Sequence, residues 1–477
     1  MLQEPILIGR KQEIETLKRV QDSYKSEFLI LYGRRRVGKT FLVNQFFDGQ
    51  FTFRMTALAN ATTKQQLLNF HTAMMGFDPG LAGSSPPSGW FEAFQLVIKL
   101  AEKDKRAKKV IFFDELPWFD THGADFLSAL EHFWNSWASL RNDVLLISCG
   151  SAASWMINKL IRNRGGLHNR ITERVLLQPF TLSETEAFLQ AKGAEYDRYQ
   201  LLELYMAMGG VPFYLENIQV NRSVAQNIDR MFFSPTGLLR LEYDTLYQSL
   251  FKQSGKHISV VEALAQQPRG MLRKELISKS VLSEGGAASI VLNELEHSGF
   301  IQRYVPFGKK KRYVIHRLAD PYSLFYLTFV KDSKAQGEGA WLARLNNPQW
   351  RAWSGHAFEY ICMNHVSAIK KHLGISGVYT EVSPWRSQQT EPAAQIDLLI
   401  DRNDRVINIC EMKFSIAPYS ITKTYAEQLT NKLTAFRMET NTRKTLFLTM
   451  ITTFGLQQNQ YSLRLVKDAL DMNALFD

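Results

Sequence analysis

Eight residues near the N-terminus have the types and the spacing of a loop that binds phosphate. The segment Gly33-Arg-Arg-Arg-Val-Gly-Lys-Thr40 follows the apolar run 28–32 and precedes 41–47, whose apolar residues have helical spacing. Its glycines are therefore expected in a turn from a strand to a helix. Glycine permits backbone angles that turn successive N–H groups toward an anion, and the start of a helix adds the positive end of its dipole. The sequence thus predicts a nucleotide site at this turn.

Each residue of this loop has a role in that interpretation. Lys39 is expected to reach the β- and γ-phosphates and Thr40 to ligate Mg²⁺, so ATP and Mg²⁺ are the predicted cofactors. The residues expected to contact the nucleotide are Gly33, Arg34, Arg35, Arg36, Val37, Gly38, Lys39 and Thr40. A chance glycine loop between a strand and a helix is the alternative, and the agreement of the whole pattern with its flanks disfavours it.

Two adjacent carboxylates end the next apolar run, 110–113. Hydrolysis of ATP requires a carboxylate on the metal ion and a group that positions the attacking water. Asp114 is the candidate for the metal side, and Glu115 is the candidate general base. An acidic pair of this kind is, in isolation, often a solvated strand end. We favour the catalytic interpretation because the glycine-rich loop occurs in the same chain.

Hydroxyl side chains end a third apolar run, 144–151. In an open parallel sheet, ligands bind at the carboxyl ends of the strands, where the γ-phosphate would lie. Ser148 and Ser151 are therefore candidate sensors of the γ-phosphate. The alternative is a strand followed by a helix that Ser151 or Ser154 caps, and the sequence favours neither interpretation.

Five stretches of the first half of the chain belong together. They are Ile8-Gly9-Arg10 before a helix, the glycine-rich loop, Phe113–Trp118, Cys149–Ser151 and Gly209–Pro212. Together they resemble prokaryotic AAA+/STAND-like ATPases of the archaeal ATPase group. The resemblance implies that Gly9 and Arg10 lie near adenine, and that Pro212 contacts the nucleotide from a helical lid. It also implies that Arg170 acts as an arginine finger, although a surface ion pair suits Arg170 equally well.

Length, composition and charge set the class of protein. With 477 residues, 45% of them hydrophobic, the chain can form about three domains. No apolar run approaches the roughly 18 residues of a membrane span, and the N-terminus lacks a signal pattern, so a cytoplasmic protein without a membrane partner is expected. Cys149, Cys362 and Cys410 are expected to be reduced core thiols. The net charge of +11 favours DNA as a partner, and a homo-oligomer is left open.

The resemblance also extends beyond the nucleotide site, because members of the archaeal ATPase group often carry a winged helix and a nuclease-like C-terminal domain. The expected fold is a multidomain α/β protein with a P-loop NTPase core, a helical lid, a winged helix and a restriction-endonuclease-like α/β domain. The expected boundaries are 1–180 for the AAA+-like core, 181–250 for the lid, 251–330 for the winged helix, 331–349 for a linker and 350–477 for the nuclease-like domain.

Residues 257–316 have a pattern of short helices and strands around a basic turn. The expected helices are 258–265, 271–276 and 286–295, and the expected strands are 299–305 and 312–316. This order is typical of a winged helix, whose wing would touch DNA phosphates through Lys309, Lys310, Lys311 and Arg312. The third helix carries Ser289, Asn293 and Glu294 but no Arg or Lys. A module that packs against a partner is therefore an equal alternative.

A second group with catalytic potential lies near the C-terminus. Residues 395–400 and 405–413 are expected to form a hairpin, in which Glu411 and Lys413 share a face because they are two positions apart. With Asp397 on the neighbouring strand, two carboxylates and an ammonium group can hold Mg²⁺ and activate a bound water against a phosphodiester.

These C-terminal residues resemble the PD-(D/E)xK nuclease superfamily, whose fold is restriction-endonuclease-like. The resemblance implies catalytic roles for Asp397, Glu411 and Lys413, a metal-binding role for Glu359 and a supporting role for Gln428. The chain departs from the superfamily pattern before Asp397, where Gln and Ile replace Pro. The alternative is an acidic strand end beside an exposed Glu/Lys pair on a hairpin.

These interpretations combine into hypotheses of different classes. In the first, ATP hydrolysis moves the lid and gates an Mg²⁺-dependent cut in DNA by the C-terminal domain. In the second, the chain is an ATP-switched DNA-binding or regulatory protein whose nuclease fold is catalytically silent. A chaperone-like remodeller is a third option, and no convincing aromatic-x-Gly pore segment supports it.

Overall fold

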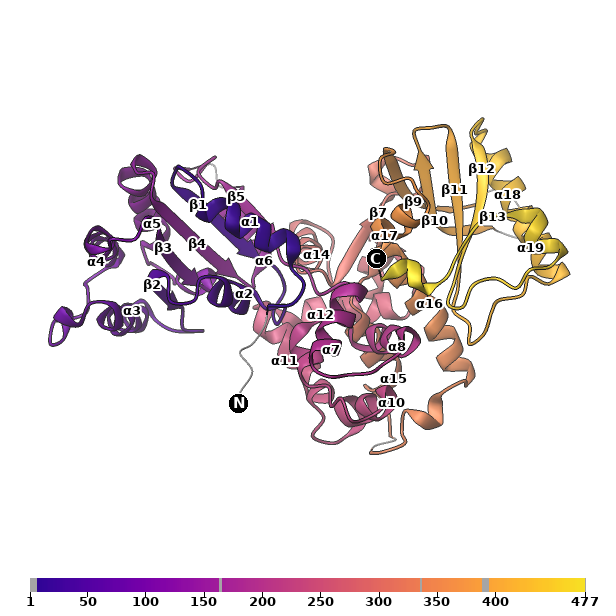
Figure 1. Ribbon diagram of the computed structural model, residues 1–477, viewed down its shortest axis with the longest axis horizontal. Coiled ribbons are helices and arrows are strands. Elements are labelled where there is room, and N and C mark those ends of the chain that lie inside the picture. The colour runs from indigo at the N-terminus through magenta and orange to yellow at the C-terminus, as the bar shows by residue number, and fades with distance from the viewer. Residues whose placement is uncertain (1–6, 163–164, 335–336, 388–393, 477) are drawn as a thin grey trace. The chain divides into compact units, whose positions relative to one another are not determined.

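The computed structural model describes residues 7–162, 165–334, 337–387 and 394–476 (Figure 1). The chain divides into two compact units, Met1–Pro179 and Phe180–Asp477, and each has hydrophobic cores of its own. None of the helices in the described ranges combines the length and the apolar character that crossing a membrane requires.

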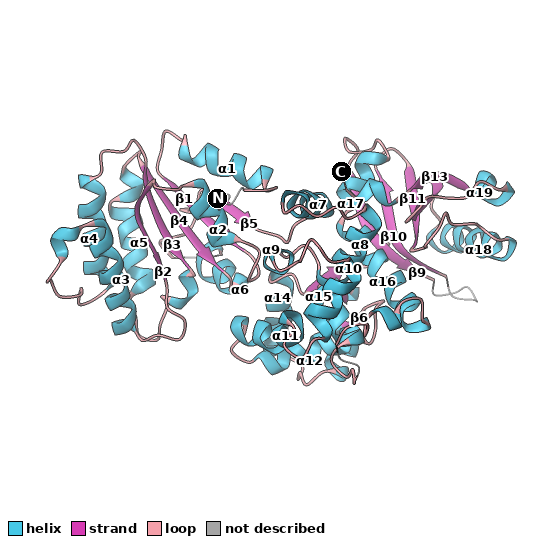
Figure 2. Ribbon diagram, turned by 60° about the horizontal axis from the view of Figure 1, so that its bottom comes forward, coloured by secondary structure: helices cyan, strands magenta, loops and turns pink. Residues whose placement is uncertain are grey.

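A five-stranded parallel sheet forms the middle of the first unit (Figure 2). Its strands are β1 (Glu27–Tyr32), β2 (Phe51–Thr56), β3 (Lys109–Asp114), β4 (Val144–Gly150) and β5 (Glu173–Leu176), in the spatial order β2-β3-β4-β1-β5. The apolar runs that predict β1, β3 and β4 are buried almost throughout, as is usual for parallel strands with helices on both faces.

Helices cover both faces of this sheet. They are α1 (Lys11–Gln21), α2 (Lys39–Phe46), α3 (Thr63–Phe77), α4 (Trp90–Lys103), α5 (Phe126–Ser136) and α6 (Ala153–Trp155), with short turns η1 (Pro79–Leu81), η2 (Leu116–Trp118), η3 (Ala138–Leu140) and η4 (Met156–Ile161). The first two pack on one face, for example through Leu17 and Leu42. The next three pack on the other, for example through Phe70, Phe94 and Phe133.

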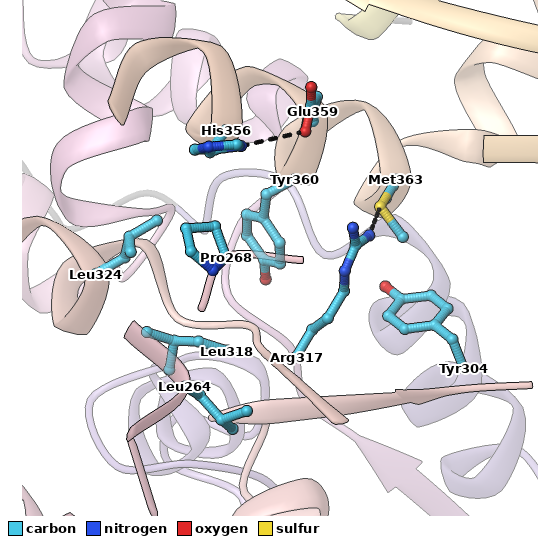
Figure 3. A pocket seen from close by; sticks show the side chains of 10 residues that line it. All are labelled: Leu264, Pro268, Tyr304, Arg317, Leu318, Leu324, His356, Glu359, Tyr360 and Met363. Atoms are coloured by element: carbon cyan, nitrogen blue, oxygen red, sulfur yellow. Dashed lines mark hydrogen bonds and ion pairs between the residues drawn. The ribbon is translucent and has the colours of Figure 1, made fainter. Parts of the chain in front are cut away.

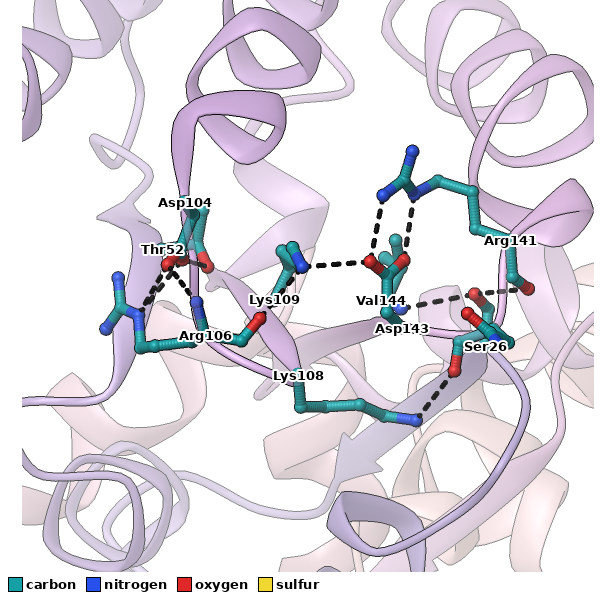
Figure 4. A network of polar contacts seen from close by, with 10 residues as sticks. Ser26, Thr52, Asp104, Arg106, Lys108, Lys109, Arg141, Asp143 and Val144 are labelled. Atoms are coloured by element: carbon teal, nitrogen blue, oxygen red, sulfur yellow. Dashed lines mark hydrogen bonds and ion pairs between the residues drawn. The ribbon is translucent and has the colours of Figure 1, made fainter.

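Polar contacts fix the loops at the amino ends of the central strands (Figure 4). The Asp143 carboxylate accepts two 2.8 Å hydrogen bonds from Arg141 and pairs with Lys109 Nζ at 2.9 Å. These bonds, from Arg141 first and Lys109 second, lower the pKa of Asp143 to about 2 in spite of its partial burial. Ser26 joins the same network, because its hydroxyl donates to Arg141 O and accepts from Val144 N. The network holds the end of the sheet that lies opposite the nucleotide loop.

The second unit begins with helices. They are α7 (Leu182–Ala191), α8 (Arg198–Met208), α9 (Pro212–Glu216), α10 (Val224–Ile228), η5 (Asp229–Phe233) and α11 (Leu238–Leu250). Their apolar residues belong to one core, which continues into the C-terminal part of the unit. Capping boxes at Thr181, Asp197 and Ser223 fix the starts of α7, α8 and α10.

Residues 254–318, here named the middle module, combine three helices with a small sheet. The elements are α12 (Ser254–Ala265), β6 (Met271–Leu272), α13 (Arg273–Lys279), α14 (Gly286–His297), β7 (Ile301–Tyr304), η6 (Lys311–Tyr313) and β8 (Ile315–Leu318), with the sheet order β6-β8-β7. The expected helix over 271–276 is wrong at its start. Met271 and Leu272 instead pair with His316 and Ile315, because the turn at Gly270 (φ 82°) sends the chain back along β8.

The expected linker is a packed segment over the part that the structure describes. Asp229, itself buried, accepts hydrogen bonds from the amides of Gly339 (3.0 Å) and Trp341 (2.6 Å). The Trp341 ring packs among aromatic rings that include Phe325 and Trp353. The flanking elements are α15 (Pro321–Phe329), η7 (Leu342–Arg344), α16 (Pro348–Asn364) and α17 (Val366–His372).

A mixed five-stranded sheet forms the C-terminal module, residues 380–476. Its elements are β9 (Thr380–Arg386), β10 (Gln395–Arg402), β11 (Val406–Lys413), α18 (Lys423–Thr440), β12 (Thr445–Thr452), α19 (Gln460–Leu465), β13 (Val466–Leu470) and η8 (Met472–Leu475), in the sheet order β13-β12-β11-β10-β9. The predicted hairpin of β10 and β11 is confirmed as an antiparallel pair, whereas β12 and β13 run parallel to β11. One face packs on the core shared with α16, and the other packs against α18.

Candidate functional site

The glycine-rich loop joins β1 to α2 through residues with positive φ. They include Gly33 (φ 148°), Arg36 (φ 71°) and Gly38 (φ 90°), and Gly38 is the N-cap of α2. A Cβ atom at Gly33 would lie 2.3 Å from the carbonyl oxygen of Leu177, so no larger residue fits there. The glycine spacing seen in the sequence therefore has a local structural cause.

Lys39 bends back over the loop. Its Nζ donates to the carbonyl oxygens of Gly33 and Arg34 and to the Ser151 hydroxyl, each at 3.0 Å. The side chain is 5% exposed, and this burial lowers its pKa. The ammonium group thus bonds to oxygens at the position where the sequence predicts phosphate oxygens.

Thr40 and Asp114 bring together the two predicted Mg²⁺ ligands. The Thr40 hydroxyl donates to Asp114 Oδ2 at 2.7 Å, and the carboxylate is 2% exposed. Burial raises the pKa of Asp114, although the bond from Thr40 opposes the shift. A hydroxyl and a carboxylate in contact are oxygen donors of the kind that Mg²⁺ takes beside a nucleotide, so these residues fit that ion.

Ser151 contacts both the lysine and the predicted base. Its amide donates to Glu115 Oε2 at 3.1 Å, and its hydroxyl donates to Glu115 Oε1 at 2.6 Å while accepting from Lys39. The structure therefore brings Ser151 to the site. Ser148 lies inside β4, fully buried and paired in register with Phe113, so it faces the sheet interior. The two candidate sensors thus occupy different surroundings.

The other predicted nucleotide contacts are divided between the two units. Arg10, at 4% exposure, donates to Val37 O (2.9 Å) and Gln178 O (2.7 Å), so it ties the segment after Gly9 to the glycine-rich loop. Arg170 is exposed, and its backbone amide bonds to Leu167 O. Pro212 begins α9 in the second unit. Contacts of Gly9, Arg10, Arg170 and Pro212 with a nucleotide stay predictions.

The C-terminal candidates occupy the end of the β10–β11 ladder. Leu398 pairs with Cys410, and Asp397 and Glu411 are the neighbours of this last pair on their two strands. Asp397 Oδ1 accepts from Arg317 of β8 at 2.9 Å and from Gln395 Nε2 at 2.7 Å. Burial raises the pKa of Asp397, but Arg317 and Gln395 outweigh this effect and hold it below its ordinary value.

Glu411 is engaged by a lysine that the sequence reasoning missed. Lys432 Nζ of α18 donates to both carboxylate oxygens, at 2.8 and 2.5 Å. Lys413 instead lies over the ring of Tyr425, with Nζ 5.0 Å from the centroid. The spacing of Tyr425 and Lys432, two helical turns apart on α18, is the signal that places both on the face turned to the sheet.

Glu359 and Gln428 lie on two different helices, α16 and α18. Glu359 Oε2 lies 3.4 Å from His356 Nδ1 on the same helix (Figure 3), and Gln428 is exposed on α18. His356 and Glu359 line a cavity of ≈ 30 Å³ together with Arg317 and Tyr360. This cavity has room for about one water molecule. Across the described ranges, His, Cys, Asp and Glu side chains nowhere gather in threes in a way that could hold a metal ion. Because Asp397 and Glu411 are already bound to the protein cations Arg317 and Lys432, their oxygens in this arrangement do not fit Mg²⁺.

Comparison with known proteins agrees with the nucleotide site. Residues 7–218 match the model of a family described as an ATPase domain predominantly from Archaea. The uncharacterized protein MJECL04 of Methanocaldococcus jannaschii is 23% identical over 419 residues, 86% of this chain and 88% of that protein. The uncharacterized ATP-binding protein MJ0423 of the same organism is 44% identical over 45 residues, 9% of this chain and 76% of that protein.

Among solved structures, the Walker-type ATPase PABY2304 of Pyrococcus abyssi has a similar fold. The TM-score is 0.50 at 17% sequence identity, over 67% of this chain and 96% of that one. The parallel sheet, the loop and the family match together define an ATPase domain with a P-loop core. The predicted resemblance to archaeal ATPases is confirmed for residues 7–218.

Proposed function

We propose that the chain binds ATP and hydrolyses it at the turn between β1 and α2. The observation that carries this proposal is a continuous line of contacts, from Thr40 to Asp114 and from Lys39 through Ser151 to Glu115. A phosphate-binding loop, two metal-side oxygens and a general base are the parts that the reaction needs. The similarity of residues 7–218 to ATPase domains supports the assignment.

Each residue has a defined task in this reaction. The amides of residues 33–40 hold the phosphates, and Lys39 exchanges its carbonyl partners for phosphate oxygens. Thr40 and Asp114 would hold Mg²⁺, which when bound offsets charge on the β- and γ-phosphates. Glu115 takes a proton from the attacking water. Because Ser151 contacts both Lys39 and Glu115, an anion bound at the lysine affects the base through one side chain.

Nucleotide binding and turnover with single variants test the proposal. Lys39→Ala should abolish ATP binding, because it removes the buried cation of the loop. Glu115→Gln should keep binding and lower turnover by about 100-fold or more, the size typical of a lost general base. Lys18→Ala, an exposed lysine of α1, is the control and should leave both unchanged. Unchanged turnover in Glu115→Gln would remove this residue from the role of base.

We further propose that the middle module is a winged helix and that DNA is its partner. The loop between β7 and β8 presents Lys309, Lys310 and Arg312 as exposed cations, and the whole chain carries a charge of +11. The helix α14 is a poor reader of bases, because Glu294 bonds to His257 (2.7 Å) and Ser289 accepts from Arg273 (3.0 Å). We therefore expect contacts to the phosphate backbone without base specificity.

For the C-terminal module we favour the catalytically silent alternative. Its restriction-endonuclease-like character stays a proposal, supported by the placement of Asp397 and Glu411 beside the last pair of the β10–β11 ladder. We derive no cleavage step, because both carboxylates are held by protein cations. The proposed function is thus an ATP-switched protein that binds DNA. Mg²⁺-dependent cleavage by wild type that disappears in Glu411→Gln would restore the ATP-gated nuclease.

A further inference from the structure

Two carboxylates beside the last pair of the β10–β11 ladder are each neutralised by a cation from a different part of the chain. Like charges close together on an antiparallel pair destabilise it unless they are compensated. Arg317, from β8 of the middle module, compensates Asp397, and Lys432, from α18, compensates Glu411. An irregularity between Ile396 and Leu399 in the β9–β10 pairing brackets Asp397, and such bulges redirect a side chain.

The ion pair between the two modules is well enclosed. The Arg317 side chain is 10% exposed and that of Asp397 is 16% exposed. The guanidinium is also held by Arg269 O at 3.1 Å and by the sulfur of Met363 at 3.0 Å (Figure 3). A buried guanidinium that loses its carboxylate remains as an uncompensated charge, so this contact depends strongly on both partners.

A second contact joins the same two modules. The amide of Phe307, in the loop between β7 and β8, donates to Pro384 O of β9 at 2.8 Å. Its ring packs on Phe436 with centroids 5.2 Å apart, and Phe436 in turn packs on Trp385. Among the described residues, an ion pair, a backbone hydrogen bond and ring packing therefore attach the middle module to the C-terminal module.

We propose that Asp397 and Arg317 form an ionic clasp that fixes the middle module to the C-terminal sheet, while Lys432 compensates the neighbouring Glu411 from within the C-terminal module. Asp397 is then a docking residue, and the loop that carries Lys309 and Lys310 is held in one position relative to β9. The inference goes beyond the proposed function, because it assigns a role to residues outside the nucleotide site.

Hydrogen exchange of the full-length protein measures the clasp through peptides that cover Phe307 and β10. Asp397→Asn and Arg317→Met should each speed exchange at Phe307 by about tenfold or more, because each leaves one enclosed group unpaired. In the double variant Asp397→Asn/Arg317→Met, exchange at Phe307 should be no faster than in the less affected of the two single variants. The double variant leaves neither charge of the ion pair without its partner. Mn²⁺ should leave exchange of the wild type unchanged. Exchange protection of β12, in the same module and away from the ion pair, checks that each variant is folded.

Asp401→Asn is the matched control, because Asp401 pairs with Lys444 inside the C-terminal module. It should affect exchange in β10 but not at Phe307. Losses of exchange protection that add up in the double variant would overturn the clasp. Protection of β10 and β11 by Mn²⁺ would also overturn it, if Glu411→Gln abolishes that protection. If Asp397→Asn alone unfolds the module, the double variant decides: a folded double variant supports the clasp, and an unfolded one contradicts it.

Discussion

The hydroxyl of Ser151 donates a 2.6 Å hydrogen bond to Glu115 and accepts one of 3.0 Å from Lys39. One side chain therefore joins the proposed base, Glu115, to the proposed phosphate-binding cation, Lys39. In this arrangement Glu115 is oriented by Ser151 through two bonds, because the amide of Ser151 also donates to it. Ser151 is thus a positioning residue for the proposed hydrolysis.

Removal of this hydroxyl should slow the reaction without preventing binding. We expect Ser151→Ala to lower kcat by about 10- to 100-fold while KM changes little, because Glu115 loses its shorter bond but the loop keeps its other donors. Ser151→Thr retains the hydroxyl and should recover most of the rate. Ser154→Ala, in the adjacent helix, is the control in steady-state kinetics. A parallel rise in KM would show instead that Ser151 acts in binding.

Substitution by alanine should lower the stability of the first unit by different amounts at two glycines of the loop. Gly33→Ala should destabilise the first unit by about 2–3 kcal/mol, because the new Cβ would meet Leu177 O and the backbone must move. Gly38→Ala meets no atom within 4 Å and should cost only the positive-φ strain, about 1 kcal/mol. Amide exchange in β1 and α2 of the full chain measures both. Equal losses of stability in the two variants would contradict the close approach of Gly33 to Leu177 O.

The Asp143 network should make the first unit sensitive to acid. Because the pKa of Asp143 is lowered to about 2 by Arg141 and Lys109, its contribution is complete above the unfolded value of about 4 and is lost as the pH falls toward 2. We expect Asp143→Asn to cost about 1 kcal/mol at pH 7, after allowance for solvent screening, and less at pH 3. Thermal unfolding of both proteins at pH 7, 4 and 3 checks this. A constant difference across that range would exclude the linkage.

Binding to duplex DNA should depend on the loop between β7 and β8. The double variant Lys309→Glu/Lys310→Glu should weaken binding at least tenfold and reduce the salt slope by about 2, one for each lost phosphate contact. Lys423→Glu/Lys467→Glu removes the same charge from exposed positions of the C-terminal module and serves as the control. Fluorescence anisotropy at several salt concentrations gives both quantities. Equal effects of the two double variants would leave only a general charge effect.

The nucleotide site was largely predictable because its residues follow one another along the chain. The apolar run of β1, the glycines and the helical spacing of α2 each have a local cause. Asp114 is the last residue of β3, and Glu115 follows it directly. The separation of Ser148 from Ser151 depends on where β4 ends, since Ser148 lies inside the strand and Ser151 follows it. The sheet order that brings β4 beside β1 is not a local property.

The C-terminal site was predictable only in part. The hairpin of β10 and β11 follows from alternation, and its register makes Asp397 and Glu411 the neighbours of the Leu398–Cys410 pair. The partners of these carboxylates come from distant segments, since Arg317 lies 80 positions from Asp397. No periodicity in the sequence reports such a contact, so the difference between a metal site and two ion pairs became visible only in three dimensions.

The bonds from Asp229 to Gly339 and Trp341 have a mechanical consequence. The segment is fixed in place and does not act as a flexible linker, because a buried carboxylate binds its amides and other rings enclose its tryptophan. A displacement of η5, which carries Asp229, would consequently move this segment with it, since hydrogen bonds join Asp229 to Gly339 and Trp341.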